Sequence, residues 1–476
     1  MNILFIEPTP GFGIIDEKQR KKRAAGFFPP LGIAILATIL EQKGHKCKVI
    51  DLQIEQYTAK DFLKEIKSFN SEIICISIFT ALATEAFKLS KLIKENLNLP
   101  IICGGPHVSL FPKETLEQNK EIDYIVFGEG EHTLPELINA LEKNLPKENI
   151  KGIFFRKDEK IIETEKRSQI YNLDEIPIPS RKFFKMKKYI QVPNQYNRLP
   201  ITNIITSRGC AYNKCKFCSE SGELHSHYRR NSVERVIEEI KYLIDNYKIR
   251  EIYFWDDEFV VDNNWVQRFC ESLKKENFDL TWTCCAKVNY VNQKILKIMA
   301  SAGCWNIFYG LESGDQKLLD DLKKGQTLEE IRNAIKWTKE AGIKARGSFM
   351  LGLPGETPEL GQKTINFAIE LDLDYAIFCL TTPYPGTKLY KEFLDKGNKN
   401  IEWDKYTSFF PVYLPEGYKN KEELIELQKS AYKQFYFRYN YIKNIIKSLK
   451  NKQDLKRNIN GVKYLLKMKL LNSPGL

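Results

Sequence analysis

Short apolar runs that alternate with amphipathic helical stretches constrain this chain of 476 residues more than any other feature. Within residues 1–150, five apolar runs have the length and the bounding turns of buried strands; they lie at 2–8, 46–52, 72–79, 101–105 and 123–130. The intervening stretches, such as 30–44 and 81–97, carry apolar residues at helical spacing. This rhythm predicts an α/β domain with a doubly wound, Rossmann-like parallel sheet.

The same alternation returns six times between residues 201 and 390. The apolar runs there lie at 200–207, 251–257, 280–287, 306–313, 345–353 and 375–382, with a helical pattern between each pair. Six such units fit an open, partial (β/α)6 barrel better than a closed barrel of eight. Because sites in these folds gather at the C-terminal ends of the strands, we expect functional residues at those ends.

Two segments depart from the alternation. Residues 151–200 begin with a small hairpin and continue with two prolines that favour extended backbone, which predicts a linker. Residues 391–476 are predicted to be helical, with a packing face of apolar residues over 421–450. The sequence therefore predicts an N-terminal domain over 1–150, a linker over 151–200, a barrel over 201–390 and a helical region over 391–476.

The positive charge of the chain is concentrated at its C-terminus. Residues 419–476 contain 14 Lys and Arg against 4 Asp and Glu, whereas residues 1–418 contain 59 against 57. A lysine-rich helix is usually a solvated face, and no nucleic-acid-binding module follows the barrel, so nucleic acid is a poor candidate partner. An acidic electron donor, a reduced flavodoxin or ferredoxin, would complement this charge.

Composition excludes several other classes of protein. With 43% hydrophobic and 12% aromatic residues the chain has the content of a folded protein. No secretion signal opens it, and no uncharged apolar run approaches the roughly 20 residues that a membrane span needs. We expect a soluble, cytoplasmic protein.

Three of the 11 cysteines stand apart from the rest. Most lie singly in apolar runs, where a free cysteine behaves as a small buried hydrophobe. Cys210, Cys215 and Cys218 instead share one loop directly after the first strand of the second domain. Three close thiolates can bind three irons of a 4Fe-4S cubane and leave the fourth iron open, but with His225 or His227 they could also hold zinc.

The surrounding motifs favour the cluster. Phe217 precedes the last cysteine of the trio, and the stretches 251–259, 307–314, 347–357 and 381–387 complete a pattern that resembles the radical S-adenosylmethionine (SAM) superfamily over residues 201 to about 390. One departure is the spacing, since four residues separate Cys210 from Cys215 where three are common. The resemblance implies an iron-sulfur, metal-binding enzyme that uses a 4Fe-4S cluster to cleave SAM.

The same resemblance implies SAM contacts at the strand ends. Asp257 lies where many members have a glycine-rich end that contacts the methionyl amine, Glu312 could accept the ribose hydroxyls, and the backbone near Phe217 and Gly352 would cradle the adenine. Each carboxylate could instead cap a helix or face solvent. Arg346 interrupts an apolar strand, where a charge is costly without a partner; it could pair with the SAM carboxylate or reach an exposed strand end.

The first domain resembles the cobalamin-binding domain that precedes the barrel in one large subgroup, the class B methyltransferase-like members. The matching stretches are 29–52, 76–86, 103–112 and 127–137. Glycine turns at neighbouring strand ends would let a flat ligand approach the backbone. The resemblance implies cobalamin contacts at Thr80, Gly104, Gly105, Gly128, Glu129 and Gly130.

No histidine of this domain sits in the Asp-x-His-x-x-Gly motif that ligates cobalt. The nearest candidate, His107, lies in a glycine turn, where a structural hydrogen bond is the simpler role. If cobalamin binds, no histidine ligand is required.

The leading function is therefore a cobalamin-dependent methyltransferase that acts on an unreactive carbon of a small molecule or natural-product precursor. Two alternatives stay open. The chain could be a non-methylating member, an oxidative cyclase or a rearrangement enzyme, or it could bind cobalamin and iron-sulfur without turnover.

Overall fold

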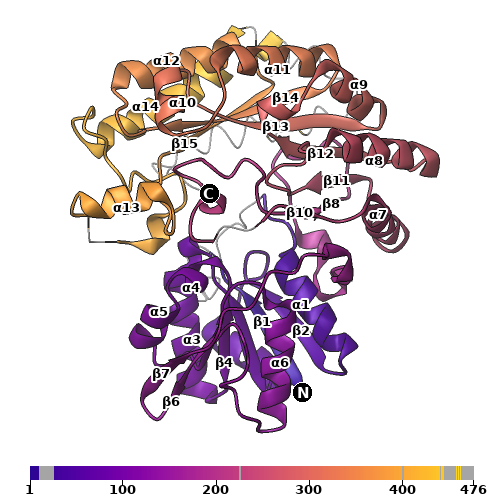
Figure 1. Ribbon diagram of the computed structural model, residues 1–476, viewed down its shortest axis with the longest axis vertical. Helices are drawn as coiled ribbons and strands as arrows, with labels where there is room; N and C mark the ends of the chain where they lie inside the picture. Colours follow the sequence, from indigo (N-terminus) through magenta and orange to yellow (C-terminus); the bar gives the residue numbers. More distant parts are fainter. Residues whose placement is uncertain are drawn as a thin grey trace. The chain divides into compact units, whose positions relative to one another are not determined.

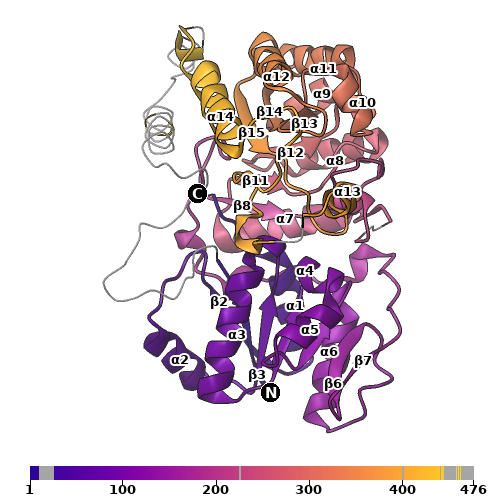
Figure 2. The ribbon, with the colours of Figure 1, turned by 90° about the vertical axis from the view of Figure 1, so that its left-hand side faces the viewer.

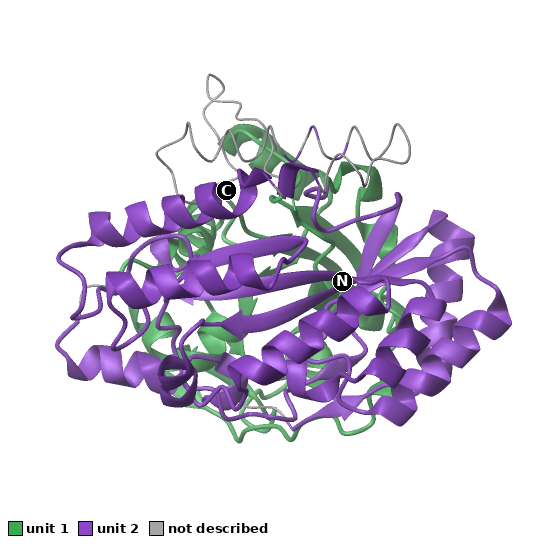
Figure 3. Ribbon diagram, turned by 90° about the horizontal axis from the view of Figure 1, so that it is seen from above, with its two compact units in different colours: residues 1–190, 399–404 green, residues 191–398, 405–476 purple. Residues whose placement is uncertain are grey.

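The computed structural model describes residues 1–9, 26–224, 227–398, 401–439, 441–443, 457, 459 and 461. The chain forms two compact units, one of residues 1–190 with 399–404 and one of residues 191–398 with 405–476 (Figure 3). The predicted fold class is confirmed, because each unit is built on a sheet whose consecutive core strands run parallel. Within the described ranges, no helix has the length and apolar character that crossing a bilayer requires.

Unit 1 contains a seven-stranded sheet in the order β2-β1-β3-β4-β5-β6-β7. The first five strands are parallel, and β6 and β7 form an antiparallel hairpin that extends the sheet from β5. The strands are β1 (Asn2–Glu7), β2 (Lys46–Asp51), β3 (Ile73–Ser77), β4 (Ile101–Gly104), β5 (Tyr124–Val126), β6 (Ile153–Lys157) and β7 (Lys160–Glu163). The hairpin of the expected linker thus completes the first sheet.

Helices cover both faces of this sheet (Figure 1). Alternate strand residues face opposite sides; Ile3 and Phe5 pack with α1 and α6, while Leu4 and Ile6 pack with the helices of the other face. The helices are α1 (Leu31–Gln42), α2 (Ala59–Ser68), α3 (Ala83–Leu97), α4 (Pro106–Leu110), α5 (Pro112–Gln118) and α6 (Gly130–Glu142). The predicted doubly wound arrangement follows from strands that are apolar on both faces.

Unit 2 contains an open six-stranded parallel sheet in the order β15-β14-β13-β12-β11-β8. The six predicted runs supply the strands β8 (Ile201–Ile204), β11 (Glu251–Phe254), β12 (Thr281–Ala286), β13 (Cys304–Glu312), β14 (Lys344–Leu351) and β15 (Tyr375–Leu380). A short ribbon of β9 (Ser207–Arg208) and β10 (Arg229–Arg230) follows β8. The two edge strands, β8 and β15, are not paired with each other, as expected for a partial barrel.

Seven helices of unit 2 contribute to a single apolar core on one face of its sheet. They are α7 (Val233–Tyr247), α8 (Asn263–Glu276), α9 (Gln293–Ser301), α10 (Gln316–Asp321), α11 (Leu328–Glu340), α12 (Pro358–Glu370) and α14 (Lys421–Tyr436). The buried residues of α13 (Lys388–Asp395) lie outside this core. Side chains of Ser232, Asp262, Asn292 and Thr327 cap the first turns of α7, α8, α9 and α11.

The predicted packing face of the C-terminal helix is present. Leu424, Ala431 and Phe435 of α14 are buried in the core of unit 2, and the helix runs alongside β15 and α12 (Figure 2). The basic stretch beyond residue 443 lies almost entirely outside the described residues.

Two buried carboxyl groups end neighbouring strands of unit 1. Asp51 accepts hydrogen bonds from the Tyr189 hydroxyl at 2.6 Å and the Gln53 N–H at 2.9 Å, and burial raises its pKa to about 6. Glu7 is bonded to Ser77, but its Oε2 is buried without a partner in the described part of the chain. Burial, and then the nearby Asp51, raise the pKa of Glu7 well above its usual value.

Replacing Glu7 with Gln tests this. A free glutamate ionises near pH 4.3, whereas folded Glu7 ionises only at higher pH, so ionisation favours the unfolded chain and the native protein loses stability as the pH rises above about 4.5. Glu7→Gln removes that loss and should raise the free energy of unfolding at pH 8 by about 1 kcal/mol or more, with no gain at pH 4. Denaturant unfolding at both pH values measures this. The exposed Glu163→Gln should show no such difference, and equal stabilities of Glu7→Gln and the native protein at pH 8 would contradict the expectation.

Candidate functional site

The loop of Cys210, Cys215 and Cys218 leaves the C-terminal end of the first strand of unit 2 and is held by three hydrogen bonds. The Tyr212 hydroxyl donates to the Lys323 carbonyl at 2.9 Å, and the Lys216 N–H donates to the Leu322 carbonyl at 3.0 Å. The Lys216 carbonyl accepts from the Leu389 N–H, also at 3.0 Å. Contacts from outside the loop therefore fix the segment that carries the thiols.

The three thiols keep some solvent-accessible surface although protein surrounds them. Burial is the main cause that raises their pKa values, that of Cys218 to about 12, and charge on one thiol disfavours charge on the others. Among the described residues, no three His, Cys, Asp or Glu side chains converge on one metal ion. A cubane needs no such convergence, because each thiolate bonds a different iron. This donor set fits a cluster. His225, one of the two histidines that could complete a zinc site, lies outside the described residues.

The acidic strand end divides into two structural carboxylates and one accessible one. Asp256 Oδ1 accepts from the N–H and the hydroxyl of Thr206, at 3.0 and 2.8 Å, and from the Ser207 hydroxyl. Glu258 accepts from the Lys287 N–H at 2.9 Å. Asp257, between them, keeps an exposed side chain although much protein lies around it. The loss of solvent caused by this protein, and then the charge of Asp256, raise the pKa of Asp257 to about 6. Of the three, Asp257 is the carboxylate available to a ligand.

A buried ion pair lies beside the thiols. Glu312 ends β13 in a left-handed conformation, with φ of 65°, and accepts from the Lys324 ammonium at 2.8 Å. Lys324 and Lys287 both favour the charged form of the Cys215 thiol. Lys287 Nζ donates to the Gly325 carbonyl at 2.7 Å and lies 4.4 Å from the centre of the Tyr212 ring. Two cations thus lie where a thiolate-bound, anionic cluster would form.

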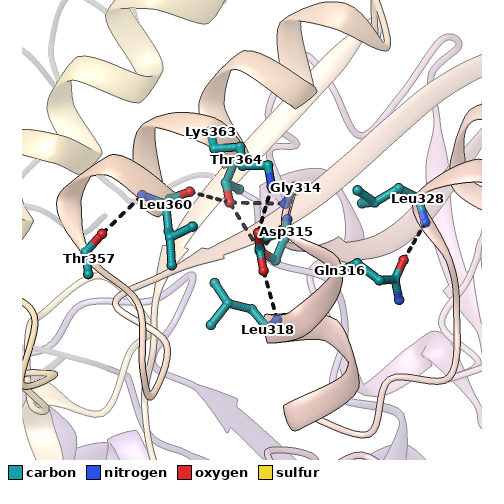
Figure 4. Close-up of polar contacts among 10 residues, drawn as sticks. Gly314, Asp315, Gln316, Leu318, Leu328, Thr357, Leu360, Lys363 and Thr364 are labelled. Atoms are coloured by element: carbon teal, nitrogen blue, oxygen red, sulfur yellow. Dashed lines mark hydrogen bonds and ion pairs between the residues drawn. The ribbon is translucent and has the colours of Figure 1, made fainter.

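The turn after Glu312 is fixed to α12. The Gly314 N–H donates to the Thr364 hydroxyl at 3.1 Å, and Lys363 pairs with Asp315 at 2.7 Å (Figure 4). Asp315 also caps α10 through the Leu318 N–H, at 3.2 Å. A Cβ on Gly314 would approach the Thr364 Cα to 2.9 Å, so close packing requires glycine there. Glu312 is therefore carried on a rigid strand end.

The turn after β14 is closed by Glu356. This fully buried carboxyl accepts from the Gly352 N–H at 2.6 Å and from the Tyr418 hydroxyl at 2.5 Å, and burial raises its pKa to about 7. Gly352 has φ of 76°, and a Cβ there would lie 2.8 Å from Leu424 of α14. Phe217 packs in the same small apolar cluster as Leu353. The C-terminal region thus supports the predicted adenine turn.

Arg346 lies on the inner face of the barrel, opposite the strand residues Ala345, Phe349 and Leu351 that pack with the core helices. It is the third residue of β14, pairs in register with Phe308, and is 6% exposed. Its guanidinium lies 4.1 Å from the centre of the Phe308 ring. Of the two roles that the sequence left open, reaching an exposed strand end does not fit, because the side chain is buried in the middle of the sheet.

In unit 1, the predicted cobalamin contacts follow three neighbouring strands. Thr80 comes after β3, Gly104 ends β4 and Gly105 follows it, and the run Gly128 to Gly130 comes after β5. Gly105 has a local reason to be glycine, since a Cβ would lie 2.9 Å from the backbone N and O of Ile78. Gly128 has φ of 76° and open space beside it. Glu129 accepts from the Ile170 N–H at 2.7 Å.

The expected hydrogen-bonding role of His107 is wrong for its side chain. The imidazole is 2% exposed and makes no hydrogen bond within the described residues. It packs instead against the rings of Phe87, Phe111 and Trp403, with centres 5.0–6.1 Å apart. Burial lowers its pKa to about 4, so the ring is neutral near pH 7.

Sequence reasoning missed Lys287, Lys324 and the Glu356–Tyr418 contact. Lys287 directly follows β12, so the rule that sites lie at strand ends could have found it. Lys324 lies in a loop after α10, and Tyr418 lies far along the chain from Glu356; no local pattern marks either residue.

Comparison with known families agrees with both units. A model of the B12 binding domain matches residues 21–138, and a model of the radical SAM superfamily matches residues 204–368. The structure of the radical SAM methyltransferase TsrM from Kitasatospora setae, with cobalamin and a 4Fe-4S cluster bound, has a similar fold, with a TM-score of 0.68 and 19% identity over 83% of this chain and 78% of that one.

Similar proteins extend over nearly the whole chain. The uncharacterized methyltransferase PH0819 of Pyrococcus horikoshii is 37% identical over 442 residues, which cover 92% of this chain and 93% of that protein. The anaerobic magnesium-protoporphyrin IX monomethyl ester cyclase of Rubrivivax gelatinosus is 27% identical over 92% of this chain and 77% of its own length. The chain therefore belongs to the B12-binding radical SAM enzymes, whose cofactors are a 4Fe-4S cluster, SAM and cobalamin.

Proposed function

We propose that this enzyme transfers a methyl group from SAM, by way of cobalamin, to an unreactive carbon of a small molecule. The observation that carries the proposal is the similarity, along nearly the full length of both chains, to a protein named as a methyltransferase. The strand ends of unit 2 support it, because they combine three thiols with carboxylates and cations that suit a zwitterionic ligand.

In this proposal Cys210, Cys215 and Cys218 hold the cluster. Asp257 accepts the amine of SAM, since its carboxylate is exposed and Asp256 and Glu258 are occupied. Glu312 accepts the ribose hydroxyls while Lys324 neutralises its charge. The turn at Gly352, closed by Glu356, and the backbone at Phe217 flank the adenine.

When bound, the cluster supplies the electron that cleaves SAM and cobalamin carries the methyl group, so the chain needs an external reductant. The chain's own residues orient and shield. Lys287 and Lys324 place positive charge beside Cys215, which favours its thiolate form. The loop anchors at Tyr212 and Lys216 keep the thiols in place without the ligand. Thr80, Gly104, Gly105, Gly128, Glu129 and Gly130 would contact cobalamin.

A second candidate is a non-methylating enzyme such as an oxidative cyclase. Its support is the similarity to the magnesium-protoporphyrin ester cyclase, which is weaker in identity than the similarity to the methyltransferase. Both reactions would use the residues named above. They differ in whether the methyl group of SAM leaves on another molecule.

The cluster assignment predicts the effect of removing its thiols. After anaerobic reconstitution the protein should hold about one 4Fe-4S cluster and cleave SAM when reduced, whereas the combined alanine variant of Cys210, Cys215 and Cys218 should lose both properties. Iron and sulfide analysis and 5′-deoxyadenosine release measure this. Cys47→Ala, which removes a partly accessible thiol of unit 1, should behave as the native protein. Stoichiometric zinc without SAM cleavage would refute the assignment.

The packing of His107 predicts that cobalamin binds without it. His107→Phe keeps the aromatic contacts, so cobalamin retained through gel filtration should have an unchanged absorption spectrum. His107→Ala leaves a cavity and should cost about 2–4 kcal/mol of folding free energy, again without a spectral change. A spectral shift or a loss of cobalamin in His107→Phe would show that the imidazole ligates cobalt.

The methyl-transfer proposal is tested by following the methyl group. Protein loaded with cluster and cobalamin, reduced and given methyl-labelled SAM, should release S-adenosylhomocysteine and transfer label to the corrinoid fraction in a single turnover. The cluster variant described above controls for chemical methylation. If SAM is cleaved to 5′-deoxyadenosine while no label reaches the corrinoid under any reductant, methyl transfer is wrong and the cyclase-like function replaces it.

A further inference from the structure

The inner face of the unit 2 barrel keeps solvent-accessible surface. Residues that point toward the helices are buried in the core, such as Ile307, Phe349 and Phe378. Their neighbours that point the other way are only partly buried: Cys285, Phe308, Ser348, Met350, Ile377 and Cys379. Burial nevertheless raises the pKa values of Cys285 and Cys379 to about 12.

Arg346 is a buried charged group of this face for which the described residues supply no counterion. Its Nε is buried without a partner, and its guanidinium makes no hydrogen bond or ion pair with any described residue. Glu312 and Glu251, which lie on the same face, are already engaged. Glu312 pairs with Lys324, and Glu251 accepts from the N–H groups of Asn197 and Arg198 and from the Trp305 indole. A buried charge without a counterion is costly, because burial removes its hydration and nothing replaces it.

The depth of Arg346 separates it from the proposed SAM contacts. Its guanidinium stays at the level of Phe308, four residues before Glu312, which at the rise of a strand is about 13 Å along β13. Gly352 directly follows β14 and is six residues beyond Arg346, which at the rise of a strand is about 20 Å. The cations beside the cluster loop are Lys324 and Lys287, at the other end of the strands. Arg346 is therefore placed to meet a molecule that enters the barrel more deeply than SAM.

We infer that Arg346 binds an oxyanion of the substrate, a carboxylate or a phosphoryl group, on the inner face of the barrel. Guanidinium presents a planar fork of donors that matches both groups, and the low polarity around Phe308 strengthens such a pair. This inference rests on the proposed function, because it names the class of molecule that the site accepts. The substrate is then a small acid whose anionic end lies deep and whose reacting carbon lies nearer the strand ends.

The test uses protein loaded with cluster and cobalamin, titrated separately with inorganic phosphate and with propionate at constant ionic strength. Binding is followed by the rise in melting temperature, and SAM binding is measured in parallel by equilibrium dialysis. Phosphate, propionate or both should bind the native protein. In Arg346→Gln, the anion concentration that gives half of the rise in melting temperature should increase at least about tenfold. Arg346→Lys keeps the charge but loses the fork of donors, so its anion affinity should lie between those of the native protein and Arg346→Gln.

Arg268→Gln removes an exposed positive charge from α8 and should leave the anion midpoints unchanged. SAM affinity should stay within about twofold in every variant. The inference is overturned if neither anion binds the native protein, if Arg346→Gln binds both anions as well as the native protein does, or if it loses tenfold or more in SAM affinity, which would place the guanidinium at SAM. If Arg346→Gln does not fold, the same comparisons apply to Arg346→Lys. None of these readouts needs methyl transfer, so a failure of the proposed function would be seen separately.

Discussion

The parallel pairing of β8 with β11 is the constraint on which the candidate site depends. It brings the C-terminal ends of both strands to one edge, where Asp256 accepts three hydrogen bonds from Thr206 and Ser207. Cys210, the first of the three cysteines, follows Ser207 by only three residues. If Asp256 did not hold the strand ends together, the anchors at Tyr212 and Lys216 would fix a loop whose starting point was free to move. Asp256 is thus best understood as a positioning residue.

Charge on the inner side of unit 2 is arranged at two depths. Near the strand ends, Lys324 and Lys287 face a carboxylate and a thiol, so their charges are largely balanced. Deeper in the barrel, Arg346 faces an aromatic ring, which compensates a cation only in part. The contrast explains why we assign an anion of the substrate to the deeper site. A single buried arginine is compatible with a stable fold, because the apolar core on the other face of the strand is complete without it.

The C-terminal region contributes to the site through packing. Leu424 of α14 fills the space that a side chain at Gly352 would occupy, and Tyr418 shares the Glu356 carboxyl with the turn. Both contacts hold the turn against the C-terminal region. The glycines of unit 1 have different structural roles. Gly105 is required because the Ile78 backbone is close, whereas Gly128 borders open space. A glycine turn is therefore not by itself evidence of a ligand.

The sequence alone determined the core strands, their parallel arrangement and the loop that carries the thiols. Buried strands, amphipathic helices and a cysteine trio are local patterns, and the rule that parallel sheets gather sites at one edge needs only those patterns. It also marked Arg346 as costly, without saying what the arginine meets. Only the tertiary structure decided that Asp257 is accessible while Asp256 and Glu258 are engaged, that His107 packs against rings, and that Lys324 and Tyr418 reach residues distant in sequence. The reason is physical. Local periodicity determines which face of a helix or strand a residue occupies, but its contact partner comes from another segment whose position that periodicity does not specify.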